Sequence, residues 1–230
     1  MTADRPSATD PGPRAAWGLI VAAGRGSRFG GPKQFGRAGG RPLLWYSLSA
    51  FDRCSEVAGW TVVTLPERVG AVRRLCLRAG FRRLRAVVAG GATRTESVRL
   101  GLETLPERGR VAVHDAARPL LVPAMIAAGL RLCGSLPVTY AVPVADSLKR
   151  VAAGRVVASV DRDGLWAVQT PQFFPLPLLR RAHRSADGLA ATDDCALVER
   201  LGIRPRVLVP PGPNLKVTWP EDLALVRRLL

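Results

Sequence analysis

The sequence predicts an α/β protein built on a doubly wound, mostly parallel sheet, and three observations support this prediction. Short apolar runs alternate with segments of about 10–15 residues that have helical spacing, the pattern of strand–helix–strand units. The first apolar run, Trp17–Ala22, passes directly into a glycine-rich loop, as a central strand of such a sheet does. The alternation stops between Val142 and Gly164, where two extended stretches flank a short turn. We therefore expect one sheet domain with a projecting β-hairpin arm.

Length and composition fit a single folded domain. The chain has 230 residues, of which 47% are hydrophobic and 23% are charged, an ordinary globular balance. Residues 1–16 lack periodicity and are rich in Pro, Gly, Ala, Thr and Asp, so we expect a disordered tail before a domain over 17–230. No apolar run approaches the roughly 18–20 residues of a membrane helix. Ala15–Gly24 is better explained as a buried strand than as a signal peptide, so we expect no membrane partner.

Each expected element follows from apolar periodicity or from a capping signal. Short apolar runs predict strands, and apolar residues at helical spacing predict helices. Thr93 with Glu96, and Thr218 with Glu221, have the spacing of capping boxes, and Pro220 suits a first helical turn. The expected strands are Trp17–Ala22, Trp60–Leu65, Leu84–Val88, Val111–His114 and Arg206–Val209, and the expected helices are Leu43–Phe51, Glu67–Ala79, Thr95–Thr104, Val122–Cys133, Pro177–Ser185, Thr192–Gly202 and one that begins at Pro220.

The interruption of this rhythm predicts an arm at about residues 142–164. Val142–Arg150 and Arg155–Asp161 are extended stretches on either side of the turn Ala152-Ala153-Gly154. An isolated hairpin is only marginally stable in water, so this one is expected to pack on another subunit. The arm therefore predicts a homodimer.

The charge of the chain favours anionic partners without identifying them. The formal net charge is +16, from 34 Lys and Arg against 18 Asp and Glu. All basic residues except Lys33, Lys149 and Lys216 are arginines, which indicates compositional bias rather than a nucleic-acid footprint on one face. A basic nucleic-acid-binding protein is the distant alternative. The 4 cysteines lie far apart without metal-ligand spacing, which favours free thiols and a cytoplasmic location.

The loop from Gly24 to Lys33 is the first candidate binding element. Its glycines allow backbone N–H groups to approach phosphate oxygens, and Arg28 and Lys33 supply positive charge. The order of residues is not that of a P-loop, and the spacing does not fit the G-x-G-x-x-G dinucleotide fingerprint. A tight structural turn is the alternative explanation.

From this loop onward the chain resembles the sugar-alcohol phosphate cytidylyltransferase family, most closely its members that act on 2-C-methyl-D-erythritol 4-phosphate in the non-mevalonate isoprenoid pathway. The resemblance implies a Rossmann-like fold, CTP as co-substrate and transfer of CMP to a polyol phosphate. Ribitol-5-phosphate cytidylyltransferase is the nearest alternative, and an inactive scaffold is a third. The matching blocks, in chain order, are Ala22-Ala23-Gly24-x-Gly-x-x-Arg28 with Pro32-Lys33-Gln34, Gly90-Gly91-Ala-Thr-Arg94-Thr-Glu-Ser97, His114-Asp115-Ala116-Ala117-Arg118-Pro119, Val160-Asp161-Arg162-Asp-Gly-Leu-Trp166, Thr170-Pro171-Gln172-Phe173-Phe174, Thr192-Asp193-Asp194 and Asn214-Leu215-Lys216-Val217-Thr218.

The resemblance also implies roles for individual residues. Arg28, Lys33 and Lys216 are expected to neutralise the triphosphate during catalysis. Ser147 and Arg162, on opposite strands of the arm, are expected to complete the partner subunit's site. The residues expected to bind the nucleotide are Ala22, Ala23, Gly24, Gly26, Gly91, Arg94, Ser97 and Ala116, and those expected to bind the acceptor are Asp115, Arg118, Ser147, Arg162, Thr170 and Thr192.

Asp115 is the expected Mg²⁺ ligand, because Mg²⁺ is held by one or two carboxylates together with substrate phosphates. An Asp after a strand can equally cap a helix, and Asn214 is a weaker candidate that would add a carbonyl oxygen to the metal. His114 lies inside a strand run and is expected to be a packed core residue rather than a general base. In one respect the chain departs from the family: two fewer residues than usual separate Arg28 from Pro32-Lys33-Gln34.

Overall fold

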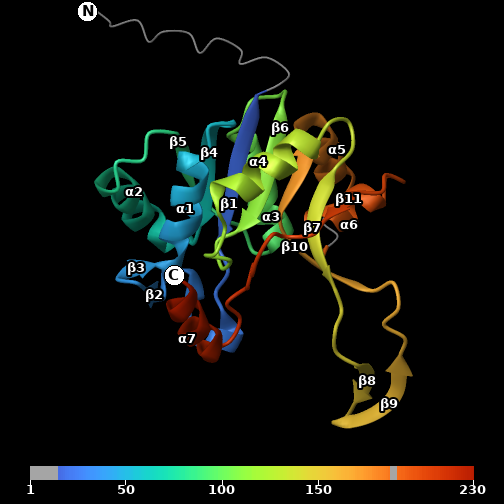
Figure 1. Ribbon diagram of the computed structural model, residues 1–230. Helices are drawn as coiled ribbons and strands as arrows, with labels where there is room; N and C mark the ends of the chain where they lie inside the picture. The colour runs from blue at the N-terminus through green and yellow to red at the C-terminus, as the bar shows by residue number, and fades with distance from the viewer. Residues whose placement is uncertain (1–14, 187–190) are drawn as a thin grey trace, which may run out of the picture.

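A computed structural model describes residues 15–186 and 191–230, so nearly all of the expected tail lies outside the described residues. A seven-stranded sheet in the order β11-β7-β10-β6-β1-β4-β5 forms the centre of the molecule (Figure 1). β10 runs antiparallel to both its neighbours, whereas the other pairings in this sheet are parallel. The mostly parallel sheet is therefore confirmed. Its strands are β1 (Ala16–Ala22), β4 (Val57–Thr64), β5 (Leu84–Ala89), β6 (Arg110–Asp115), β7 (Val138–Pro143), β10 (Trp166–Pro175) and β11 (Arg206–Leu208).

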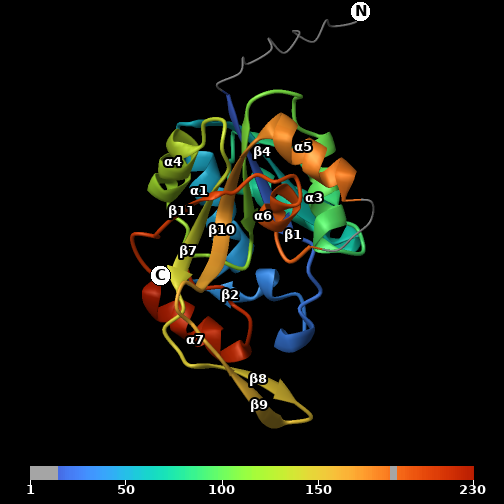
Figure 2. The same ribbon diagram turned by 90° about the vertical axis from the view of Figure 1, so that its right-hand side faces the viewer.

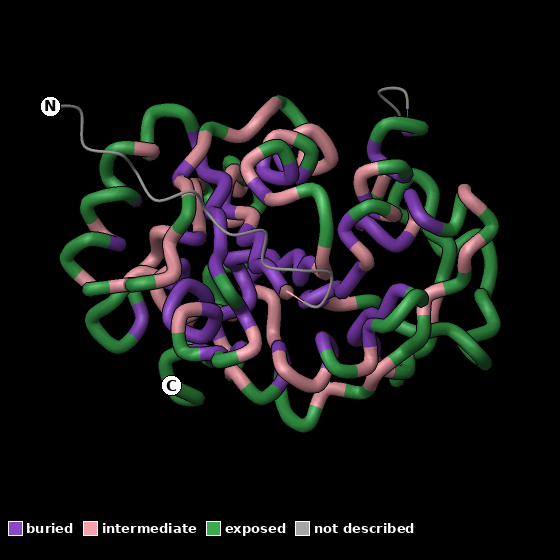
Figure 3. The backbone as a smooth tube through the Cα atoms, turned by 90° about the horizontal axis from the view of Figure 1, so that it is seen from above, coloured by how far each residue is buried: buried purple, intermediate pink, exposed green. Residues whose placement is uncertain are grey.

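Helices cover both faces of the sheet, as Figure 2 shows with α1 and α4 on one side and α3 and α5 on the other. One apolar core lies beneath α1, α2 and α4, and a second lies beneath α3, α5 and α6. The buried residues accordingly run through the middle of the molecule (Figure 3). The helices are α1 (Leu43–Arg53), α2 (Val69–Arg78), α3 (Arg94–Glu103), α4 (Pro123–Leu132), α5 (Leu176–Ser185), α6 (Asp194–Glu199) and α7 (Pro220–Leu229).

Two strands of the sheet were not predicted from the sequence. Val142 and Pro143, which were expected in the hairpin, belong to β7, and β10 was not expected at all. β10 contains Pro171, which lacks a backbone donor and argues against a strand. The structure accommodates this residue because the pairing of β10 with β7 shifts register between Val168 and Gln172. Short 3₁₀ turns, η1 (Ser27–Phe29), η2 (Lys33–Phe35) and η3 (Pro66–Arg68), and the pair β2 (Arg37–Ala38) with β3 (Arg41–Pro42) complete the described elements.

The expected arm is a two-stranded hairpin that extends away from the sheet (Figures 1 and 2). Its strands are β8 (Leu148–Ala152) and β9 (Arg155–Val160), joined by a tight turn in which Ala153 and Gly154 both have positive φ. Ser147 and Arg162 do not lie on its strands as expected, because they flank them at the base of the hairpin.

The two predicted capping boxes differ in the structure. The Thr93 side chain accepts a hydrogen bond from the Glu96 N–H as predicted, but the Glu96 carboxylate accepts from Ala92 N rather than closing the box on Thr93. At α7 the prediction is wrong in its acidic partner: Asp222, not Glu221, accepts from the backbone N–H of Thr218 and Trp219. Of the described helices, none is long and apolar enough to cross a membrane.

Candidate active site

The carboxyl ends of the parallel strands open onto a cavity of about 660 Å³. This is where ligands bind in open α/β sheets, because the loops that follow neighbouring strands converge there. The loops after β1, β5 and β6 line it, together with the segment before α7. The predicted residues that line this cavity are Ala22, Ala23, Gly24, Gly26, Arg28, Lys33, Gly91, Arg94, Ser97, Asp115 and Lys216.

The glycine loop is held in shape by a buried glutamine. Gln34 Nε2 donates to the carbonyl oxygens of Ala22 and Gly24 at 2.7 and 2.8 Å, which ties the end of the loop to its beginning. Gly26 has φ of 66°, and a Cβ there would lie 1.9 Å from the carbonyl oxygen of Gly31. Only glycine therefore fits this position. These contacts fix the shape of the loop from within, and the side chains of Arg28 and Lys33 line the cavity.

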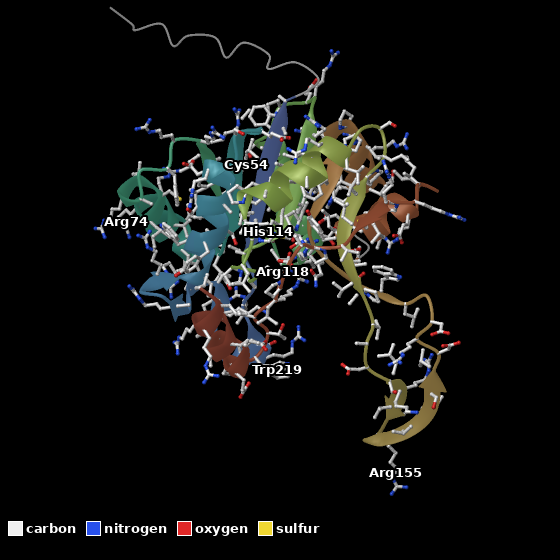
Figure 4. All side chains as sticks on the ribbon, viewed as in Figure 1. Cys54, Arg74, His114, Arg118, Arg155 and Trp219 are labelled. Carbon is white, nitrogen blue, oxygen red and sulfur yellow. The ribbon has the colours of Figure 1, made fainter. Side chains whose placement is uncertain are left out.

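Positive charge is concentrated on one wall of the cavity. Burial, together with the neighbouring charges of Lys216 and Arg28, lowers the pKa of Lys33. Repulsion between cations raises the free energy of the empty site, and a bound anion removes that repulsion. Arg28 also lies 5.9 Å from the ring centroid of Trp219 at the start of α7, whose position below the sheet is labelled in Figure 4. This wall is suited to a polyphosphate.

Asp115 ends β6 and faces two cations. Its Oδ2 lies 2.6 Å from Lys216 Nζ, and its Oδ1 lies 3.1 Å from Arg94 Nε. Burial alone would raise the pKa of Asp115, but the charges of Arg94 and Lys216 outweigh it and hold the pKa far below its ordinary value. The alternative role as a helix cap is wrong, because the next helix, α4, has Val122 as its N-cap.

Ser97 and Arg94 lie at the start of α3 but act differently. Ser97 is buried, and its Oγ accepts from Gly91 N at 3.1 Å and donates to the Thr93 carbonyl at 2.9 Å, so it shapes the loop after β5. Arg94 reaches across the cavity wall to Asp115 and also to Asp194, at 2.8 Å. Both residues line the cavity, and their contact with the nucleotide stays a prediction.

Two of the residues expected at the acceptor, Thr170 and Arg118, lie beside Asp115, outside the lining of the main cavity. Thr170 Oγ1 accepts from Asp115 N at 3.0 Å and lies 3.2 Å from His114 Nδ1. Arg118 is buried and donates to the Asn214 carbonyl at 2.7 Å, and Figure 4 labels it just below His114. His114 is fully buried, as expected of a core residue. Ala116 follows Asp115 and is buried as well.

Thr192, Ser147 and Arg162 are placed differently from these buried residues. Thr192 is exposed, two positions before the buried Asp194, and does not line the cavity. Ser147 and Arg162 lie on the arm, and the Arg162 guanidinium donates to the Ala145 carbonyl. Neither residue lines the cavity of its own chain.

A divalent cation would have few protein ligands at this site. Within residues 15–186 and 191–230, no group of three or more His, Cys, Asp or Glu side chains could hold a metal ion. Asp115 is the acidic side chain that lines the cavity, and Asn214 Oδ1 is a buried acceptor without a partner. One carboxylate fits Mg²⁺ when substrate phosphates supply the remaining oxygen ligands.

Two residues with clear roles were missed as site residues. Gln34 and Asp194 both stand in the quoted motif blocks, yet neither was given a function. The feature that they share is a polar side chain that the fold buries. A buried carboxylate or amide must find partners, because an unpaired buried polar group is costly. The 4 cysteines, by contrast, are buried and free as expected.

Comparisons with known proteins give one consistent result. A family model described as 2-C-methyl-D-erythritol 4-phosphate cytidylyltransferase matches residues 17–230. A protein of that name from Cupriavidus pinatubonensis is 43% identical, over 92% of this chain and 92% of the relative. A solved 4-diphosphocytidyl-2C-methyl-D-erythritol synthase superposes with a TM-score of 0.80 at 38% identity, covering 94% of this chain and 98% of that one. The 2-C-methyl-D-erythritol 4-phosphate cytidylyltransferase of Thermus thermophilus superposes with a TM-score of 0.72 at 31% identity, covering 92% and 96%.

Proposed function

Because the chain belongs to the 2-C-methyl-D-erythritol 4-phosphate cytidylyltransferase family, we propose that it transfers CMP from CTP to 2-C-methyl-D-erythritol 4-phosphate. An oxygen of the acceptor phosphate attacks the α-phosphorus of CTP in line. The bond to the bridging oxygen breaks, and pyrophosphate leaves. The products are 4-diphosphocytidyl-2-C-methyl-D-erythritol and pyrophosphate.

The observation that carries this proposal is a cluster of cations around a single carboxylate in one cavity. Two polyanions must approach each other, so catalysis consists of positioning them and stabilising the charge of the transition state. Arg28, Lys33 and Lys216 line the cavity and supply that charge. The backbone of the glycine loop offers N–H groups to the phosphates, and Gly91 lines the same cavity. Lys216 starts 2.6 Å from Asp115 and is placed to turn toward the phosphates when they enter.

Mg²⁺ is the proposed cofactor, held by Asp115 and by phosphate oxygens, with Asn214 as a weaker candidate ligand. When bound, the ion would neutralise charge on the triphosphate and orient it. Both Asp115 oxygens are already paired with cations, so a metal held by Asp115 would share this carboxylate with Lys216 and Arg94.

The acceptor is proposed to bind beside Asp115, through Arg118, Thr170 and Thr192. Ser147 and Arg162 are distant from their own chain's cavity, which supports a homodimer in which each arm completes the partner's site. Exposed apolar residues on the arm, such as Val151, Val156 and Val157, at 57%, 64% and 57% exposure, support a surface that a partner covers. Four buried free thiols support a reducing, cytoplasmic location.

A pyrophosphate-release assay with CTP and Mg²⁺ tests the function. We expect turnover with 2-C-methyl-D-erythritol 4-phosphate and little with ribitol 5-phosphate at equal concentration, and none without acceptor. Faster turnover with ribitol 5-phosphate would favour the alternative acceptor, and no turnover with either would overturn the enzyme assignment.

A further inference from the structure

A continuous series of charged contacts runs from the cavity into the core between α3, α5 and α6. Lys216 Nζ lies 2.6 Å from Asp115 Oδ2, and Asp115 Oδ1 lies 3.1 Å from Arg94 Nε. Arg94 Nη1 lies 2.8 Å from Asp194 Oδ2, and Asp194 Oδ1 lies 3.0 Å from His183 Nε2. Four charged groups of alternating sign thus end at a histidine.

The cavity end of this series is partly exposed and the core end is buried. The side chains of Lys216, Asp115 and Arg94 are 39%, 12% and 24% exposed, whereas those of Asp194 and His183 are 1% and 2% exposed. Asp194 therefore cannot contact a ligand in the cavity directly. Arg94, which lines the cavity, is the residue that links this carboxylate to it.

The Asp194 carboxylate is rigidly held. It stands at the first position of α6, and its backbone N–H donates to Gln172 Oε1 on β10 at 3.1 Å. Burial raises the pKa of Asp194, but the charge of Arg94 and the hydrogen bond from His183 outweigh it and lower the pKa. A fixed, ionised carboxylate leaves the Arg94 guanidinium one favourable orientation, since a bond at Nη1 and another at Nε set its plane.

His183 supports the carboxylate as a hydrogen-bond donor. Its Nδ1 is buried and has no hydrogen-bond partner, whereas Nε2 faces Asp194 Oδ1. A proton on Nε2 makes this hydrogen bond. His183 therefore fixes the second oxygen of Asp194.

We propose that Asp194, backed by His183, is a positioning residue that orients Arg94 in the nucleotide site and thereby sets the affinity for CTP. This inference rests on the proposed function. It assigns no contact between Asp194 or His183 and the substrates. Removal of the carboxylate would leave Arg94 paired with Asp115 alone, free to rotate about that contact.

Asp193 offers a matched control. It is adjacent to Asp194 and caps α6 by accepting from Ala196 N at 2.9 Å, and it also accepts from Gln172 Nε2 at 2.7 Å. None of its hydrogen bonds involves Arg94. Asn is as good an N-cap as Asp, so Asp193→Asn tests local damage to α6, including any passed through Gln172, while both partners of the Arg94–Asp194 contact are kept.

The experiment is a double-mutant cycle read by calorimetric titration of CTP with Mg²⁺ into the purified protein. We expect Asp194→Asn to weaken CTP binding about tenfold in the wild-type background but less than twofold in an Arg94→Ala background, because coupled neighbours are not additive. Asp193→Asn should change the affinity less than twofold in either background. Equal effects of Asp194→Asn in both backgrounds, or an equal effect of Asp193→Asn, would overturn the proposal.

His183 provides a second route if Asp194→Asn fails to fold. His183→Gln keeps a donor for Asp194 and should bind CTP within about twofold of wild type, whereas His183→Leu should bind several-fold more weakly. The same affinity for both variants, measured on samples with native circular dichroism, would refute the role of His183. Absence of CTP binding by the wild-type protein would instead overturn the proposed function.

Discussion

Lys216 Nζ lies 2.6 Å from Asp115 Oδ2, although the two residues are 101 positions apart in the chain. β6 delivers the carboxylate to the edge of the sheet, and the segment before α7 delivers the ammonium group. The pair keeps Lys216 at the cavity wall before any substrate arrives. A triphosphate that enters this cavity competes with Asp115 for the ammonium group. The contact therefore holds a positive charge where the substrate can bind it.

Replacement of this lysine, or of Lys33, should reduce catalysis while the fold survives. Both side chains lie on the cavity wall, and Lys216 is 39% exposed, so truncation leaves little unfilled core. We expect Lys216→Ala and Lys33→Ala each to lower kcat about 10²–10³-fold, the range for loss of one preorganised charge-stabilising group. The measurement is pyrophosphate release at saturating CTP, with melting temperature as the check on folding.

An exposed basic residue on α2 supplies the control for these variants. Arg74 does not line the cavity. Arg74→Ala should retain kcat within about threefold of wild type, because it removes a positive charge without removing one from the cavity. Wild-type kcat in Lys33→Ala or Lys216→Ala would remove that residue from the mechanism.

The dependence on Mg²⁺ should be sensitive to Asp115. Asp115→Asn keeps the shape of the side chain but removes the charge that would hold the cation. We expect the Mg²⁺ concentration for half-maximal turnover to rise at least about fivefold, and chelation by EDTA to abolish turnover in wild type and variant alike. Glu107→Gln, an exposed site far from the cavity lining, should leave the half-maximal concentration unchanged. An identical Mg²⁺ dependence in Asp115→Asn would exclude this residue as a ligand.

The parallel half of the fold was predictable because its central strands, β1, β4 and β6, are short apolar runs that are buried on both faces. Trp17–Ala22 shows this directly, since β1 lies in the middle of the sheet and extends the run by one residue. β10 could not be predicted in the same way. Its apolar residues are interrupted by Gln169, Pro171 and Gln172, and its pairing depends on a register shift that only the assembled sheet supplies.

The cavity residues that follow predicted strands could be predicted from the sequence. Those that are positioned by contacts between distant parts of the chain could not. Lys33 and Asp115 follow predicted strands, so their convergence followed from topology. The link between Arg94 and Asp194 spans 100 positions and requires α6 to pack beside α3, which no local pattern indicates. The trans role of Ser147 and Arg162 stays a prediction, since one chain alone cannot bring them to a site.

Because the chain has 2 histidines, the protonation of the buried His114 can be followed by NMR. Burial lowers the pKa of His114 to about 3, against a smaller opposing effect of Asp115. The imidazole should therefore stay neutral at neutral pH and cannot serve as a general base that titrates there. NMR of the imidazole C–H signals should show no titration of His114 between about pH 5 and 8. A midpoint near 6.5, the ordinary value, would contradict the burial.

The same group should make stability fall in acid. The unfolded chain gains a proton on His114 below its ordinary pKa of about 6.5, whereas the folded chain does not until about pH 3. Unfolding is therefore favoured as the pH falls through this window, by up to about 1.4 kcal/mol per pH unit. Urea unfolding at pH 7.5 and 5.0 should show a larger loss of stability in wild type than in His114→Gln. Equal losses in the two proteins would mean that His114 is accessible to protons in the folded state.

Mixed dimers should reveal whether the arm works in trans. In Lys33→Ala the defect lies in the cavity, whereas in Arg162→Ala it lies on the arm, at a residue that does not line this cavity. If each arm completes the partner's site, a mixed dimer contains one site with both defects and one site with neither, so unfolding the two inactive variants together and refolding them should restore activity. Random assortment makes half of the dimers mixed, each with one intact site, so we expect about a quarter of wild-type turnover. Light scattering should show a dimer for each variant, and exchange of subunits can be verified with a tag on one of them. Activity that stays at the level of the separate variants, in a sample with demonstrated mixed dimers, would place Arg162 in its own subunit's site or outside the reaction, and the arm would then serve association alone.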